Sequence, residues 1–153
     1  SNMIYEGEIF DSKPHGIGDF YEFNETGLTI IETGTYEAGK LVSGFAQDEN
    51  NSIFNGTFQY HNDNKFFKGV VVNFELKTKY EGECLNDEFH GEGQLTTIKI
   101  TEQKRIVETH DGVDIAEKEI EVRIVQKGLF ENNELQKGET QMTWHDEDGY
   151  EVF

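Results

Sequence analysis

The sequence is poor in several residue types, and each shortage reduces the number of folds that the chain can adopt. It holds one proline, one tryptophan and one cysteine, Cys84, in 153 residues. A single cysteine cannot form a disulfide within the chain. No apolar run approaches the ~20 residues that a membrane-spanning helix needs. We therefore expect neither a disulfide-stapled scaffold nor a transmembrane helix.

Basic residues are also scarce. The chain has 13 Lys and Arg against 31 Asp and Glu, a formal net charge of −18. Such a surface repels nucleic acid and anionic lipid, whose binding depends on cations meeting phosphates. It attracts basic proteins or cations and speeds encounter with them. The simpler interpretation is that the charge only maintains solubility.

The N-terminus lacks the basic and then apolar pattern of a secretion signal. We interpret Ser1-Asn2, which precede Met3, as an expression-tag remnant. We therefore expect one domain over residues 3–153, in the reducing cytoplasm. Only 35% of the residues are hydrophobic, yet 12 are Phe and 6 are Tyr, which predicts a core built largely from aromatic rings.

Glycine, by contrast, is plentiful and regularly spaced. Five leading glycines are each followed 9 to 13 residues later by a second glycine. The pairs are Gly7 and Gly16, Gly34 and Gly44, Gly56 and Gly69, Gly82 and Gly91, and Gly128 and Gly138. The leading glycines recur at intervals of 27, 22, 26 and 46 residues. A period of about 20–50 residues is typical of repeat architectures.

Apolar side chains stand two residues after every leading glycine. They are Ile9, Tyr36, Phe58, Cys84 and Phe130. A spacing of two is that of one face of a β-strand. Turn-forming residues follow each of these strands, near 11–14, 38–40, 61–64, 86–88 and 131–134. Each unit is therefore predicted to be a β-hairpin whose glycine lets an aromatic ring approach the backbone.

Two copies are well formed. They read Tyr-Glu-Gly-Glu at 5–8 and 80–83, then His-Gly-x-Gly at 15–18 and 90–93. This sequence resembles the MORN repeat (membrane occupation and recognition nexus), whose pattern is roughly Y-E-G-x-(W/F)-x-N-G-x-x-H-G-x-G. Copies at 34–47, 54–74 and 128–142 are degenerate, because Glu32 and Gln126 replace the leading aromatic residue and the 54–74 copy lacks the second Gly-x-Gly.

The resemblance implies an all-β fold, an elongated and twisted antiparallel sheet of successive hairpins. It also implies an interaction surface, used for scaffolding, for lipid binding or in regulatory segments of enzymes. The net charge of −18 counts against the lipid role.

Residues 96–125 fit no repeat. Their alternating apolar residues and the His110-Asp111-Gly112 turn predict one long inserted hairpin. A short helix over 115–122 is the alternative. Such an insertion either carries function or is only a lengthened repeat. Residues 140–153 are predicted to form a closing hairpin that caps the array.

No catalytic, metal or cofactor site is predicted. Cys84 occupies a repeat position otherwise held by Ile, Tyr and Phe, so we interpret it as a small buried apolar group. The five histidines lie in or beside turns without metal-ligand spacing. The acidic stretch 146–149 lacks the spaced ligands of a calcium loop.

We therefore expect a non-enzymatic module that binds a basic protein through carboxylates and rings. The candidate residues are Glu6, Glu8, Asp19, Glu22, Glu81, Glu83, Asp87 and Glu92, with Tyr21, Phe66, Phe67 and Trp144 as anchors. The most specific form of this hypothesis is an immunity protein that blocks a basic toxin such as a nuclease. The alternatives are a scaffold or regulatory part of an enzyme complex, an enzyme that uses Cys84, and an array that stacks end to end.

Overall fold

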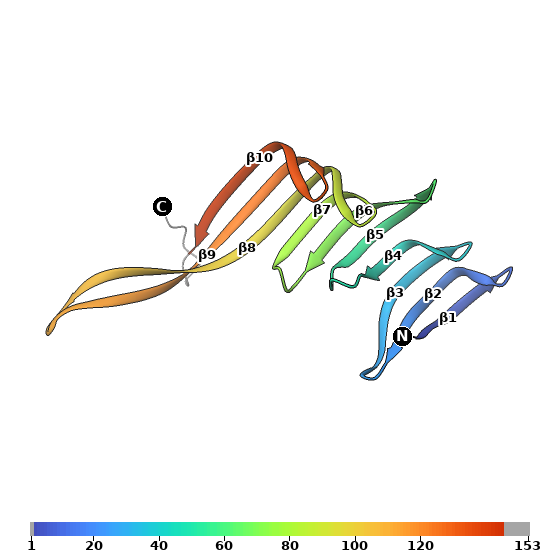
Figure 1. The fold of residues 1–153 in the computed structure, drawn as a ribbon, viewed down its shortest axis with the longest axis horizontal. Helices are drawn as coiled ribbons and strands as arrows, with labels where there is room; N and C mark the ends of the chain where they lie inside the picture. Colours follow the sequence, from blue (N-terminus) through green and yellow to red (C-terminus); the bar gives the residue numbers. More distant parts are fainter. Residues whose placement is uncertain (1, 146–153) are drawn as a thin grey trace.

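A computed structural model describes residues 2–145 as a single ten-stranded sheet. The strands follow one another in space as they do in sequence, and each pairs antiparallel with the next (Figure 1). They are β1 (Asn2–Phe10), β2 (Lys13–Asn24), β3 (Gly27–Glu37), β4 (Lys40–Gln47), β5 (Ile53–His61), β6 (Asn64–Asn73), β7 (Thr78–Leu85), β8 (Glu88–Thr109), β9 (Gly112–Glu131) and β10 (Glu134–His145). The all-β prediction is confirmed. Residues 2–145 contain no helix that could cross a membrane.

A row of glycines crosses the whole sheet, one from each strand. In strand order it runs Gly7, Gly18, Gly34, Gly44, Gly56, Gly69, Gly82, Gly93, Gly128 and Gly138, each the register partner of the next. A Cβ added at Gly34 would lie 2.0 Å from the carbonyl oxygen of Ser43, so the strands approach too closely there for any side chain.

The register of the two best copies differs from the simple order of their glycines in the sequence. Gly7 pairs with Gly18 rather than Gly16, and Gly82 with Gly93 rather than Gly91. The register shifts after each of these leading glycines, Gly7 in β1 and Gly82 in β7. As a result, Glu8 faces several residues of β2, and Glu83 faces several residues of β8. These are β-bulges, which sequence spacing alone does not reveal.

The core lies on one face of the sheet, here called the inner face. It is built mainly from aromatic rings, as predicted. Its buried members are Tyr36, Leu41, Phe54, Phe58, Phe67, Val71, Tyr80, Cys84 and Phe130. Residues beside them in sequence point to the opposite, outer face, because side chains alternate along a strand.

The five predicted turns are tight two-residue loops. Both central residues have positive φ in each, as type I′ turns require. They are Asp11-Ser12, Ala38-Gly39, Asn62-Asp63, Asn86-Asp87 and Asn132-Asn133. Two of these turns also join neighbouring hairpins. The backbone N–H of Lys65 donates to Asn86 Oδ1 at 2.8 Å, and that of Phe89 donates to Asn133 Oδ1 at 2.8 Å.

The segment 96–125 forms strands, and the helix alternative over 115–122 is wrong. The predicted long hairpin is confirmed, since Thr96 to Thr109 pair antiparallel with Val125 to Gly112. It consists of the far halves of β8 and β9, which run on past their neighbours and project from the sheet (Figure 1). Of the predicted closing hairpin, residues 140–145 are the end of β10, and the rest lies outside the described residues.

Candidate functional site: the outer face at the N-terminal end

The repeated sequence motif has a structural role that is visible in its second copy. The hydroxyl of Tyr80 donates to the carbonyl oxygen of Glu83 at 2.7 Å. The ring also covers Gly93, where a Cβ would lie 2.2 Å from the phenolic oxygen. Tyr5 repeats both contacts with Glu8 and Gly18. The leading tyrosine and the last glycine of the motif therefore form one packing unit.

The second glutamate of each copy completes that unit. Glu83 Oε2 accepts from the backbone N–H of Glu92 at 3.2 Å, and Glu8 Oε2 accepts from that of Ile17 at 2.7 Å. Each carboxylate thus satisfies a backbone donor that the bulge leaves without a ladder partner. The prediction that Glu8 and Glu83 form part of a solvated binding face misses this role.

Cys84 is 2% exposed, as the repeat position indicates. Burial, and to a smaller extent the nearby charge of Asp87, raises the pKa of Cys84 to about 12. A thiol of that pKa is neutral and a poor nucleophile at pH 7. Within residues 2–145, no three His, Cys, Asp or Glu side chains converge as metal ligands would.

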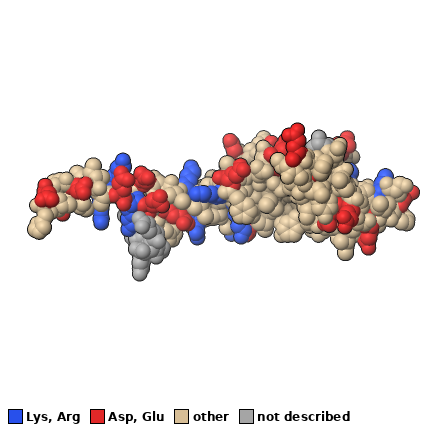
Figure 2. Space-filling model, turned by 90° about the horizontal axis from the view of Figure 1, so that it is seen from below, with Lys and Arg blue, Asp and Glu red and all other residues tan. Residues whose placement is uncertain are grey.

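Charge is distributed unevenly along the sheet. Residues 2–64, which include β1 to β5, carry eleven Asp and Glu against two Lys. Residues 65–99 carry six acidic and five basic residues. On the face drawn in Figure 2, Lys and Arg lie mainly over the long hairpin and the adjoining part of the sheet. Residues 100–145 carry ten acidic and six basic residues, and Asp and Glu also lie over the long hairpin in Figure 2. The acidic excess is therefore largest in the N-terminal strands, although it is not confined to them.

Two predicted binding residues in the middle of the sheet are engaged by lysines. Asp87 lies 2.7 Å from Lys65 Nζ, and Glu81 lies 2.9 Å from Lys79 Nζ. These two carboxylates do not share a surface with the acidic residues of β1 and β2, because β7 and β1 are six strands apart in the sheet order. At about 4.8 Å per strand, that is roughly 29 Å.

At the N-terminal end, carboxylates and apolar side chains share the outer face. Cross-strand partners define this group, because residues directly opposite one another lie on one side of a sheet. We call it the N-terminal patch: Ile4, Glu6, Asp19, Tyr21, Phe23, Leu28 and Ile30. Its four apolar side chains, Ile4, Phe23, Leu28 and Ile30, are between 47% and 61% exposed.

The charged members of the N-terminal patch lie side by side. Glu6 is the register partner of Asp19, whose carboxylate accepts from the hydroxyl of Thr33. Partial burial and the negative charges of Asp19 and Glu6 raise the pKa of Tyr21. The side chain of Glu6 forms no hydrogen bond or ion pair with any other described residue. This carboxylate is therefore available to a cation from outside the chain.

Several other predicted residues lie elsewhere. Phe67 is only 3% exposed and belongs to the core, so its assignment as a surface anchor is wrong. Its neighbour Phe66 is 42% exposed on the outer face of β6. Glu22 is the register partner of Met3 and faces away from the N-terminal patch. Strand alternation was the signal that could have separated these neighbours.

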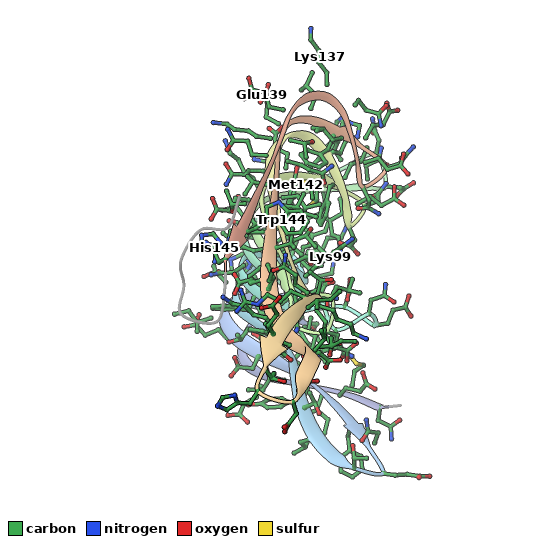
Figure 3. The ribbon with its side chains drawn as sticks, turned by 90° about the vertical axis from the view of Figure 1, so that its left-hand side faces the viewer. Lys99, Lys137, Glu139, Met142, Trp144 and His145 are labelled. Carbon is green, nitrogen blue, oxygen red and sulfur yellow. The ribbon has the colours of Figure 1, made fainter. Side chains whose placement is uncertain are left out.

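Trp144 lies on β10, the edge of the sheet farthest from β1. It is 41% exposed and pairs in register with Val122. Figure 3 shows it along β10 with Met142, and His145 at the end of the strand. Ten strands separate the two edges by nine steps, about 43 Å at the usual strand spacing. Trp144 and the N-terminal patch therefore belong to different surfaces.

In comparisons with known proteins, the chain matches no family model and no curated protein.

Proposed function

We propose that this protein is a non-enzymatic binding module that holds a basic protein against the N-terminal patch. The observation that carries the proposal is the charge asymmetry. Residues 2–64 have an excess of nine acidic residues, from eleven against two. Residues 65–99 have an excess of one, from six against five, and residues 100–145 an excess of four, from ten against six. A basic partner gains most by approaching the first five strands.

The composition of the N-terminal patch supports the same proposal. Protein interfaces commonly combine an apolar centre with a polar rim, and tyrosine is enriched among the residues that dominate binding. Here Tyr21 lies between the carboxylates of Glu6 and Asp19 on one side and exposed apolar side chains on the other. The carboxylates would select a basic partner, and the apolar side chains would supply most of the buried area.

In its most specific form, the proposal is an immunity protein that neutralises a basic bacterial toxin, such as a nuclease, in the cytoplasm. A nuclease needs a positively charged surface to bind its substrate. An acidic surface can occupy such a cleft and exclude the nucleic acid. The MORN-like array would then act as the rigid support that presents the carboxylates.

A second candidate is a MORN-type scaffold or regulatory domain of an enzyme complex. It is favoured by the long hairpin, whose tip projects beyond the sheet with mixed charges and exposed apolar residues (Figure 1). Ile106 and Ile115, for example, are register partners and are 76% and 61% exposed. A partner that bound there would not depend on the N-terminal patch.

The test begins with capture of a basic protein from the source cell, followed by measurement of its affinity. The Glu6→Gln/Asp19→Asn variant removes two charges from the N-terminal patch and should weaken binding about tenfold, since each charge at an interface rim contributes roughly 0.5–1 kcal/mol. The Glu81→Gln/Asp87→Asn variant removes the same charge from the middle of the sheet and should change the dissociation constant less than twofold. Equal losses in both variants would show that only net charge matters.

A further inference from the structure

The two good copies of the repeat differ in what covers their first strand. Residues of β1 correspond to residues of β7 at a constant offset, Tyr5 to Tyr80 and Ile9 to Cys84. Cys84 is 2% exposed, but Ile9 is 66% exposed. The reason is topological, because β7 has β6 on its far side whereas β1 is an edge strand of the described sheet. Within residues 2–145, Ile9 thus occupies a core position without a covering strand.

The pairing of β6 with β7 shows what such a covering strand provides. Phe67 lies opposite Cys84, Lys68 opposite Glu83, and Val71 opposite Tyr80. Carried over to β1, these pairs place an apolar residue opposite Ile9 and a cation opposite Glu8. Neither partner is present at the β1 edge of residues 2–145.

The protection of this edge against strand addition is selective, because it consists of a bulge and of charges of one sign. Exposed edge strands commonly carry lysine or proline, which discourage pairing with another chain. β1 contains neither, and its only charged residues are Glu6 and Glu8. These carboxylates would repel the same carboxylates of a second copy of β1. The β10 edge of another copy, if the glycine rows aligned through Gly138, would place Glu139 opposite Glu6.

We propose that β1 accepts an added antiparallel strand from the basic partner, with an apolar side chain opposite Ile9 and Lys or Arg opposite Glu8 or Glu6. This inference rests on the proposed function and adds how the partner is held. Strand addition supplies backbone hydrogen bonds along the edge, and alternate side chains supply specificity. The added strand would lie beside the N-terminal patch, so the rest of the partner could contact Tyr21 and Asp19.

A peptide derived from β6 tests this proposal directly. It has the sequence of residues 64–73 with three outer-face changes, Phe66→Thr, Val70→Lys and Val72→Thr, which keep the inner-face residues and improve solubility. A control peptide of the same composition exchanges each inner residue with its outer neighbour and so reverses the two faces. Amide hydrogen exchange of the full chain at saturating peptide should slow at least tenfold over residues 2–10, and the control peptide should produce no such change.

Variants of the chain provide the second measurement. Glu6→Lys should weaken the peptide about tenfold, because it replaces an attractive cross-strand pair with a repulsive one. Glu81→Lys, at the equivalent position of the covered strand β7, should change the affinity less than twofold. Protection confined to β10, equal binding of both peptides, or protection of β1 by self-association without peptide would overturn the proposal.

The two levels of the proposal can fail separately. If the captured basic protein still depends on Glu6 and Asp19 while neither peptide protects β1, strand addition is wrong and the proposed function stands. If the captured protein is insensitive to both residues, the proposed function fails as well.

Discussion

Replacing Gly93 with alanine should destabilise the protein strongly, because a buried ring occupies the space that the methyl group needs. The new Cβ would lie 2.2 Å from the hydroxyl oxygen of Tyr80 and 2.4 Å from its Cζ. Tyr80 is fully buried, stacks on Phe89 at 4.0 Å between ring centroids, and meets Phe130 edge-on at 5.3 Å. Displacing it would cost about 1 kcal/mol for the hydrogen bond to the backbone and about 0.5–1.5 kcal/mol for each ring contact.

The expected loss for Gly93→Ala is therefore about 2–4 kcal/mol in the free energy of unfolding, measured by chemical denaturation with circular dichroism. Gly18→Ala creates the same close contact with Tyr5, but that ring is only half-buried at the sheet edge and can move, so the loss should be smaller. Gly112→Ala meets no atom within 4 Å and should cost about 1 kcal/mol, for its backbone conformation alone. If Gly93→Ala cost no more than Gly112→Ala, the packing unit of tyrosine and glycine would be refuted.

Three further predictions concern the motif, the turns and the thiol. Glu83→Ala should lower the free energy of unfolding by about 1–2 kcal/mol, because it leaves a backbone N–H without its acceptor. Glu81→Ala, two residues earlier and exposed, should cost less than about 0.5 kcal/mol, and equal losses would contradict the bulge assignment. Asn86→Gly keeps the positive φ of the turn and should cost about 1 kcal/mol in the same assay through its lost bond to Lys65, with no loss if the turns do not join the hairpins. Cys84 should not react with a thiol reagent at pH 8 in the folded protein, since burial raises its pKa from 9.0 to about 12. Rapid labelling of the folded protein would contradict the burial of this thiol. Because burial favours the neutral thiol, the contribution of Cys84 to stability should be complete below pH 9 and lost as the pH rises from about 9 to 12.

Local patterns predicted the strands and the turns well. Apolar residues two positions after each leading glycine correctly placed Tyr36, Phe58, Cys84 and Phe130 on the buried face. The turn residues were equally informative, because type I′ turns need positive φ and favour Asn, Asp and Gly. Both signals act over a few residues and can be read along a single chain.

Sequence patterns were insufficient where the answer depends on a neighbouring strand. Gly18 rather than Gly16 joins the glycine row because of a bulge, which is a property of two strands together. Asp87 looked available to a partner, but Lys65, 22 residues earlier, lies beside it. Pairing between strands therefore decided which carboxylates remain available, and the acidic sequence alone could not distinguish Glu6 from Asp87.

Hydrogen exchange of the complex with the captured basic protein tests the central claim, that the N-terminal end of the sheet is the binding end. The outer face of β1 to β3 carries Glu6, Asp19 and Tyr21, so amides of residues 2–31 should exchange more slowly in the complex than in the free protein. Amides of the projecting hairpin, residues 100–121, should be unchanged. Protection of 100–121 with 2–31 unaffected would contradict the claim and place the partner on the long hairpin instead.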